Sequence, residues 1–398
     1  MYVVVETTQE KPTSHREFED QPIRMTLSPT LRSRFRGCLV GAVVGDCIGA
    51  PFEVTGVGGP GSYDNVQDFV NKFDVEIDGP GKLEYTDDTA MARCVAESLI
   101  ANNGQLEAKD LAKRFADEYM AHPTRGYGYN VVTVLKRLGD RDLSDVFAPA
   151  RNQFDGGGSY GNGGAMRVAP VALCGEDEVE RVIQNAKSSA LLTHSNRNGY
   201  NGAVLQALAV HQALHTATDK MNREKFAENL LNTMREKVEC QTSDEGTAND
   251  NEKEAKLTTL MSQVKKRKVE RDDVYCQRLE SLCQFLKSDP PAEEVASVLG
   301  NSISAHNSVG SALYSFLRCL NPVEGLYVQS PMERTILYAI SLDGDTDTIA
   351  SMAGAIAGAF HGIESIPEQW QKLCEGSDTA LKQADRLYEI LTKAKTER

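Results

Sequence analysis

The sequence lacks a surplus of basic residues. Its 398 residues include 57 Asp and Glu but only 43 Lys and Arg, so the formal net charge is −14 at pH 7. Nucleic-acid binding proteins usually present a basic face, because the phosphate backbone is anionic. We therefore expect no direct DNA binding, although a local pocket for an anionic ligand is compatible with this composition.

Cysteine pairs and long apolar runs are also missing. None of the nine cysteines forms a CxxC pair, and several, such as Cys38, Cys47 and Cys94, lie in apolar helical segments. Buried free thiols in a reducing compartment are therefore favoured over disulfides. No apolar run reaches the roughly 18–20 residues of a membrane span, and the apolar start, Met1–Val5, is too short for a signal peptide. We expect no membrane association.

The alternation of polar and apolar residues that marks strands is almost absent, whereas helical periodicity recurs along the chain. This pattern predicts an all-α fold, a compact single domain of more than a dozen helices over residues 31–398. Residues 1–30 are polar and lack periodicity, so they are predicted as a disordered tail. A charged stretch at about 241–268 is predicted as a disordered insertion, and the glycine-rich Val54–Leu83 as a long surface loop.

Localisation signals are weak. Lys265-Lys266-Arg267-Lys268 is either a solvated helix face or a nuclear-import signal. A start at Met25 would resemble a mitochondrial targeting segment, because three arginines and no acid follow it. The expected location is the nucleus and cytoplasm, with the mitochondrial matrix as the alternative.

Two clusters of acidic and hydroxyl residues each open an apolar helix. Glu84–Thr89 reads EYTDDT, and Asp343–Thr348 reads DGDTDT. One such residue suffices to cap a helix, and clustered carboxylates repel each other unless a cation lies among them. Oxygen ligands without nearby histidine or cysteine favour Mg²⁺, Mn²⁺ or Ca²⁺ over zinc. The clusters therefore predict two half-sites at helix N-termini that together hold one or two cations, and a metal pair about 3.5–4 Å apart is a known hydrolytic arrangement.

A central helix is predicted near the start of the domain, over residues 35–50, because this segment is apolar on nearly all sides. Glycines recur at every fourth position and form a flat face for close helix packing. They are Gly37, Gly41, Gly45 and Gly49. Asp46 is a candidate buried carboxylate. Pro51 is predicted to end this helix and to leave Glu53 at a break, where a glutamate is either solvated or functional.

A dense glycine run spans residues 154–167 and reads FDGGGSYGNGGAMR. A flexible linker would not normally carry aromatic residues and an arginine and then enter an apolar helix. Glycines let backbone N–H groups approach a phosphate, and a following helix N-terminus adds positive potential. The run matches neither GxGxxG after a strand nor a P-loop, so a ligand loop without a dinucleotide fold is favoured over a linker. His194, further on, indicates by itself no more than a histidine at a helix C-terminus.

Five separated segments carry a family resemblance. They read FRGCLVGAVVGDCIGAPFE, YTDDTAMAR, GSYGNGGAMR, LTHSNRNGYNGA and LDGDTDTIASMAGAIAGA. In this order they resemble the ADP-ribosylglycohydrolases, the relatives of dinitrogenase reductase-activating glycohydrolase, and the glycine loop is most similar to the ADP-ribosylserine hydrolase branch. The resemblance runs from about Leu31 to the C-terminus, apart from the insertion around 240–270.

The resemblance implies a binuclear Mg²⁺ centre, with Mn²⁺ as a substitute, and hydrolysis of the bond at C1″ of ADP-ribose. The implied metal ligands are Glu53, Thr86, Asp87, Asp88, Asp345, Asp347 and Thr348. Glu53 is also the implied catalytic acid/base. The implied substrate-binding residues are Gly126, Phe154, Gly158, Ser159, Tyr160, Gly161, Asn162 and His194. Among these, the loop would hold the diphosphate and ribose, Phe154 and Tyr160 would surround the adenine, and His194 would line the ribose site.

The resulting hypothesis is a Mg²⁺-dependent hydrolase of serine-linked ADP-ribose that also acts on poly(ADP-ribose) and O-acetyl-ADP-ribose. Its expected partners are ADP-ribosylated proteins, poly(ADP-ribose) and ADP-ribose, and a monomer is expected. An arginine-directed hydrolase and an inactive ADP-ribose-binding module are the alternatives. Two features depart from the family pattern: Asp343 stands where glycine is expected, and the 240–270 insertion has no implied role.

Overall fold

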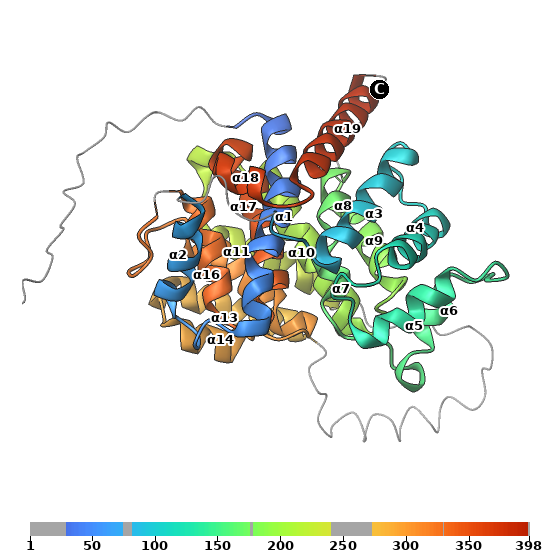
Figure 1. Ribbon diagram of the computed structural model, residues 1–398, viewed down its shortest axis with the longest axis horizontal. Helices are drawn as coiled ribbons and strands as arrows, with labels where there is room; N and C mark the ends of the chain where they lie inside the picture. Colours follow the sequence, from blue (N-terminus) through green and yellow to red (C-terminus); the bar gives the residue numbers. More distant parts are fainter. Residues whose placement is uncertain (1–28, 75–81, 176–177, 240–272, 329, 397–398) are drawn as a thin grey trace, which may run out of the picture.

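Helices make up the regular structure of the computed structural model, in which residues 29–74, 82–175, 178–239, 273–328 and 330–396 are described (Figure 1). Within these ranges there are eighteen α-helices and no strands, so the all-α prediction is confirmed. The predicted insertion at 241–268 and all but the last two residues of the predicted tail at 1–30 lie outside the described residues.

The helices of the first half are α1 (Leu31–Thr55), α2 (Tyr63–Asn71), α3 (Asp87–Ala101), α4 (Ala108–Ala121), α5 (Tyr129–Leu138), α6 (Ala148–Arg151), α7 (Gly163–Met166), α8 (Ala169–Leu173) and α9 (Val179–Leu191). Those of the second half are α10 (Arg197–His215), α11 (Arg223–Thr233), α13 (Val274–Ser288), α14 (Ala292–Leu299), α15 (Val309–Arg318), α16 (Pro331–Ser341), α17 (Thr346–His361), α18 (Glu368–Leu373) and α19 (Ser377–Thr396).

Helices α1 and α17 form the centre of the molecule and make its most extensive helix pair. Every residue of α1 from Gly37 to Gly49 is buried, and so is every residue of α17 from Thr346 to Phe360. In the view of Figure 1, α3 to α9 gather on one side of this centre, and α2, α13, α14 and α16 lie on the other. The site described below lies where the two central helices meet the first of these groups.

The glycine face of α1 explains this close packing. A Cβ atom built on Gly49 would lie 2.6 Å from the Cα atom of Asp347, and one built on Gly41 would meet the carbonyl of Gly354. Real Cβ atoms do not approach backbone this closely, so any larger residue would force the helices apart. The predicted role of the glycine repeat, a flat packing face, is therefore confirmed.

Helix α1 meets the length and hydropathy criteria of a membrane span, contrary to the expectation that no segment does. Of its most apolar stretch, 78% is buried inside the protein. A helix that is apolar all round is typical of a membrane span or of a protein core. Its burial under the other helices identifies α1 as a core helix of this fold.

Two local predictions were wrong. Pro51 does not end α1, which continues to Thr55 and ends where Gly56 (φ +68°) donates a hydrogen bond to the carbonyl of Phe52. Proline removes only one helical hydrogen bond, and the last turn keeps its others, so Glu53 lies within the helix. The segment Val54–Leu83 is not all loop either, because it contains α2, a short helix that buries Val66 and Val70 beside α16.

The cysteines agree with the expectation of free thiols. Eight of them lie in the described residues, where none of the eight forms a disulfide, and seven are buried.

Candidate active site

The second acidic cluster lies at the start of α17, against the C-terminal end of α1. Because the backbones touch at Gly49, the next turn of α1 places Glu53 beside Asp345 and Asp347. One carboxylate oxygen from each of these three residues lies within 4.8 Å of the other two. Glu53 is exposed, whereas the two aspartates are buried. The close approach of two helices thus creates one carboxylate group from residues nearly 300 positions apart.

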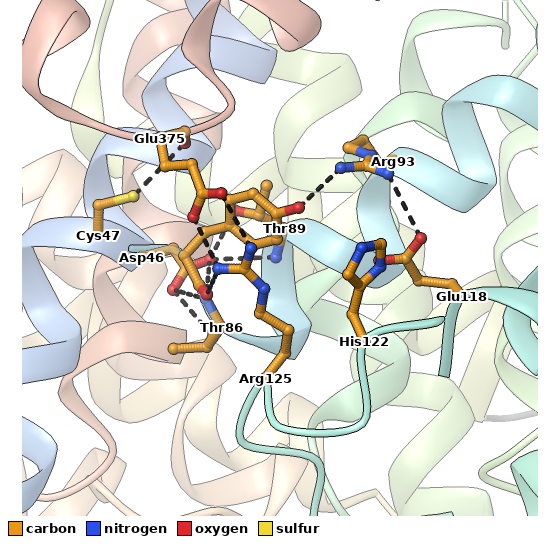
Figure 2. Close-up of polar contacts among 10 residues, drawn as sticks. Asp46, Cys47, Thr86, Thr89, Arg93, Glu118, His122, Arg125 and Glu375 are labelled. Atoms are coloured by element: carbon orange, nitrogen blue, oxygen red, sulfur yellow. Dashed lines mark hydrogen bonds and ion pairs between the residues drawn. The ribbon is translucent and has the colours of Figure 1, made fainter. Parts of the chain in front are cut away.

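The first acidic cluster is held by a buried carboxylate from α1, Asp46 (Figure 2). Asp46 accepts hydrogen bonds from the backbone N–H and hydroxyl of Thr86, at 3.1 and 2.9 Å, and from those of Thr89, at 3.1 and 2.5 Å. Asp46 therefore shares the capping of α3 with the N-cap residue Thr86, whose hydroxyl oxygen accepts from the N–H of Asp88 at 3.3 Å, and the carboxylates of Asp87 and Asp88 are left for other partners.

The two half-sites meet in space, as predicted. The hydroxyl of Thr348 donates to a carboxylate oxygen of Asp88 at 3.3 Å, and the side-chain amide of Asn162 donates to Asp345. The other carboxylate oxygen of Asp88 is buried and has no hydrogen-bond partner. An unpartnered buried oxygen is costly, which indicates a ligand or ion that completes the site.

A pocket of about 380 Å³ opens above the acidic residues. The predicted site residues that line it are Glu53, Thr86, Asp87, Asp88, Gly126, Ser159, Gly161, Asn162, His194, Asp345, Asp347 and Thr348. They come from α1, α3 and α17 and from the loops before α5, α7 and α10. Most of the residues named from the sequence therefore share one cavity, although their individual roles stay predictions.

Three predicted residues do not line this cavity. Phe154 and Tyr160 are about half exposed, and the ring of Tyr160 lies 6.4 Å from that of His306. Gly158 packs on the other side of its loop, where a Cβ atom would lie 2.6 Å from the backbone nitrogen of Asn196. Ser159 and Gly161 line the pocket while their neighbour Tyr160 does not. In an extended loop, successive residues point in opposite directions, which accounts for the difference.

Other lining residues were not predicted as site residues. They are Met91, Tyr127, Gly128, Tyr129, Asn130, Val131, Gly163, Met166, Arg167 and Ile303. Arg167 closes the glycine run, and residues 127–131 directly follow the predicted Gly126, but no pattern marked these residues individually as site residues. Ile303 carried no signal, because it reaches the pocket through pairing of the loops at Gly161 and Ser304.

The carboxylates are strongly perturbed. Burial, followed by the charge of Asp347, raises the pKa of Asp345 to about 8 and that of Asp46 to about 7. The same two causes raise the pKa values of Asp87 and Asp88 well above the ordinary range, and that of the exposed Glu53 above its usual value. Mutual repulsion of this kind is relieved by a bound cation.

The donor set therefore fits hard divalent cations. It consists of carboxylate and hydroxyl oxygens, with an orphaned oxygen on Asp88, and such oxygens suit Mg²⁺, Mn²⁺ or Ca²⁺. The loop side of the pocket presents hydroxyl, amide and imidazole groups that can bind a polar ligand. A group of hard oxygen ligands beneath a ligand-sized pocket is an arrangement that metal-assisted hydrolases use.

Comparison with known proteins specifies the class. The ADP-ribosylglycohydrolase family model matches residues 27–397. ADP-ribosylhydrolase ARH3 of Gallus gallus is 44% identical over 372 residues, which is 90% of this chain and 93% of that protein. ADP-ribosylhydrolase ARH3 of Homo sapiens is 42% identical over 369 residues, covering 91% and 94%. The chain belongs to the ADP-ribosylglycohydrolase family, and the predictions of a hydrolase and of this resemblance are confirmed.

A solved structure agrees on the fold. The ADP-ribosylglycohydrolase-related protein complex matches with a TM-score of 0.59 and 23% identity, covering 91% of this chain and 99% of the other. At this identity the match concerns the fold alone.

Proposed function

We propose that this chain is a Mg²⁺-dependent hydrolase that cleaves the C1″ glycosidic bond of ADP-ribose attached to serine, and that it also acts on poly(ADP-ribose) and O-acetyl-ADP-ribose. The observation that carries the proposal is the meeting of both acidic clusters beneath a pocket walled by the glycine loop. The identity to proteins named ADP-ribosylhydrolase ARH3 supports the substrate class.

Seven residues would hold the cations: Glu53, Thr86, Asp87, Asp88, Asp345, Asp347 and Thr348. Two Mg²⁺ ions, or Mn²⁺ in their place, would orient the ribose hydroxyls, polarise a water and stabilise developing charge. The protein contributes a pre-arranged set of oxygens, of which those of Asp88, Asp345, Asp347 and Thr348 are on buried residues. Asp46 and Asn162 stabilise that arrangement through hydrogen bonds to Thr86 and Asp345.

Glu53 is the proposed acid/base. It is the exposed member of the carboxylate group and stands at the pocket edge, where a leaving group can reach it. Its raised pKa lets the carboxyl retain a proton nearer to neutral pH. When the C1″–O bond breaks, Glu53 gives this proton to the serine oxygen. It then accepts a proton from the water whose oxygen bonds to C1″.

The walls of the pocket would bind the rest of ADP-ribose. Ser159, Gly161 and Asn162 line the wall that would hold the diphosphate and ribose, and the Ser159 hydroxyl can donate to them. The side-chain amide of Asn162 donates to Ser308 and Asp345 and supports this wall, and Gly126 also lines the cavity. Phe154 and Tyr160 stand outside the cavity with about half of their surface exposed. Such exposed rings suit stacking with a base that extends beyond the pocket, in keeping with the proposed adenine position.

The test is release of ADP-ribose from a serine-ADP-ribosylated peptide and from an arginine-linked peptide, each with Mg²⁺, with Mn²⁺ and with EDTA. The proposal expects metal-dependent release from serine alone, and loss of release in Glu53→Gln with ADP-ribose binding retained. Release from arginine would assign the chain to an arginine-directed activity. Binding of ADP-ribose without any release would make it a binding module.

The proposal extends to the cellular setting. ADP-ribosylated proteins and poly(ADP-ribose) would be the partners, a monomer the acting form, and the nucleus and cytoplasm the location, with the mitochondrial matrix as the alternative. Light scattering after gel filtration would test the monomer, and imaging of the tagged full chain would test the location.

A further inference from the structure

Arg167 is a fully buried cation beside the pocket. It follows α7, and its guanidinium lies 4.5 Å from the ring centre of Phe115. It donates hydrogen bonds to the carbonyls of Gly163 and Ser189, at 2.9 and 3.0 Å, and to the hydroxyl of Thr193, at 2.7 Å. None of the ion pairs found among the described residues involves Arg167. All three of these acceptors are uncharged, and Arg167 is the donor in each hydrogen bond.

The bond from Arg167 determines the role of the Thr193 hydroxyl. A guanidinium only donates, so the Thr193 oxygen accepts from it. Thr193 is fully buried, and its hydroxyl lies 2.7 Å from Nδ1 of His194, its one other side-chain contact within the described ranges. Buried hydroxyl protons are almost always donated to an acceptor. The Thr193 proton therefore goes to Nδ1, which must carry none.

The other ring nitrogen of His194 is directed toward the ligand loop. Cβ atoms built on Gly161 and Gly163 would lie 3.2 and 3.0 Å from Nε2, and His194 lines the pocket. No acceptor for Nε2 is found in the described part of the protein. Burial, followed by the charge of Arg167, lowers the pKa of His194 to about 3, so the ring is neutral at physiological pH. A neutral ring without a proton on Nδ1 carries it on Nε2.

We propose that Arg167 and Thr193 are positioning residues that hold His194 as the neutral Nε2–H tautomer, so that the ring donates a hydrogen bond to an oxygen of bound ADP-ribose. This inference rests on the proposed function. The opposite tautomer would leave the buried Thr193 proton without an acceptor, a penalty that favours the Nε2–H form by roughly tenfold or more. The pocket thereby selects a ligand with an acceptor oxygen at this point.

The experiment observes the tautomer directly. Two-bond ¹H–¹⁵N spectra of the full chain labelled with [¹⁵N]histidine distinguish the two neutral tautomers, and His194→Gln assigns the signal. The compared variants are Thr193→Val, which removes the hydroxyl, and Thr193→Ser, which restores it. Thr335→Val is the matched control, because Thr335 is also fully buried and its hydroxyl bonds to a backbone carbonyl in α16. Calorimetry with ADP-ribose and Mg²⁺ gives the affinity of each protein, and thermal melting gives its stability.

Wild type is expected to show His194 as the Nε2–H tautomer, unchanged from pH 5 to pH 8. Thr193→Val should show a mixture of tautomers and bind ADP-ribose roughly tenfold more weakly. Thr193→Ser should resemble wild type in both respects, and Thr335→Val should lose stability but keep its affinity. Wild type with the proton on Nδ1, or Thr193→Val with wild-type affinity, would overturn the inference.

Separate measurements test the proposed tautomer and the proposed function. If wild type shows the Nε2–H tautomer but does not bind ADP-ribose, the proposed function is wrong, whereas the positioning of His194 by Arg167 and Thr193 is supported. If Thr193→Val does not fold, the spectrum of wild type and the affinity of Thr193→Ser still decide. A positioning role then requires the Nε2–H signal in both proteins together with equal affinities.

Discussion

Gly49→Ala is the substitution that should most directly disturb the candidate metal site without removing any of its ligands. The new Cβ atom would lie 2.6 Å from Cα of Asp347 and 2.7 Å from the carbonyl oxygen of Thr346. Normal contact between such atoms is about 3.5–4.0 Å, so α1 and α17 would have to separate locally by about 1 Å. Both obstacles are backbone atoms and cannot turn aside.

The magnitude follows from two opposing terms. Overpacking in a tight core costs about 1–3 kcal/mol, and alanine recovers up to about 1 kcal/mol of helix propensity relative to glycine. A net loss of about 1–2 kcal/mol in unfolding free energy is expected. The displacement also moves Glu53 away from Asp345 and Asp347, and misplacement by about 1 Å can reduce turnover by about 100-fold.

Gly37→Ala is the matched control, because it overpacks the same helix pair at the opposite end of α1. Its Cβ atom would lie 2.6 Å from the backbone of Gly362, far along the helix from the acidic residues. Urea unfolding should show a similar loss of stability in both variants. Calorimetry with Mg²⁺ and the peptide assay should show reduced metal affinity and turnover for Gly49→Ala alone. Equal effects on metal affinity in both variants would refute the argument that local contact at Gly49 sets the carboxylate geometry.

Three further changes test other parts of the structure. Asp345→Asn should reduce both Mg²⁺ affinity and turnover by more than about tenfold, since a shared ligand is lost; unchanged values for both would exclude Asp345 as a ligand. Asp46→Asn should lower the unfolding free energy by about 3 kcal/mol, because an amide nitrogen cannot accept from Thr86 or Thr89, and a wild-type urea midpoint would contradict the capping role. Hydrogen bonds from Arg36, and then from Arg32, lower the pKa of Asp385. Its stabilisation, about 1 kcal/mol for a partly exposed pair, is present above the unfolded pKa of about 3.9 and is lost as the pH falls below it. The difference in melting temperature between wild type and Asp385→Asn should therefore be constant from pH 5 to pH 8 and shrink below pH 4, and a difference that grew in acid would show that the sign is wrong.

Much of the fold was predictable from local patterns. The periodicity of α1 and its glycines at every fourth position predicted a central helix with a face for close packing, and the second acidic cluster was predicted to open an apolar helix, which is α17. Helix periodicity and small residues are properties of neighbouring positions, so they can be recognised without a structure. The nine-residue α2 was missed, because so short a helix carries little periodic signal and is stabilised by its packing against α16.

In the candidate site, too, features within one short stretch of sequence were predictable, whereas contacts between remote segments were harder to predict. The acidic clusters and the glycine loop were recognisable because each gathers unusual residues in one short stretch. The meeting of the two acidic clusters was also predicted, from their shared pattern. The capping of α3 by Asp46 from 40 residues away and the outward position of Tyr160 were not recognisable in this way.

The sequence by itself determined which helices are central and which oxygen-bearing residues could bind cations, because residue type and spacing set helix packing faces and ligand chemistry. The tertiary structure alone decided that Thr193 links Arg167 to His194 and that Asp46 connects α1 to the start of α3. Hydrogen bonds and charge repulsion act over a few ångströms in space, and distances of that kind between remote segments exist only after the chain has folded.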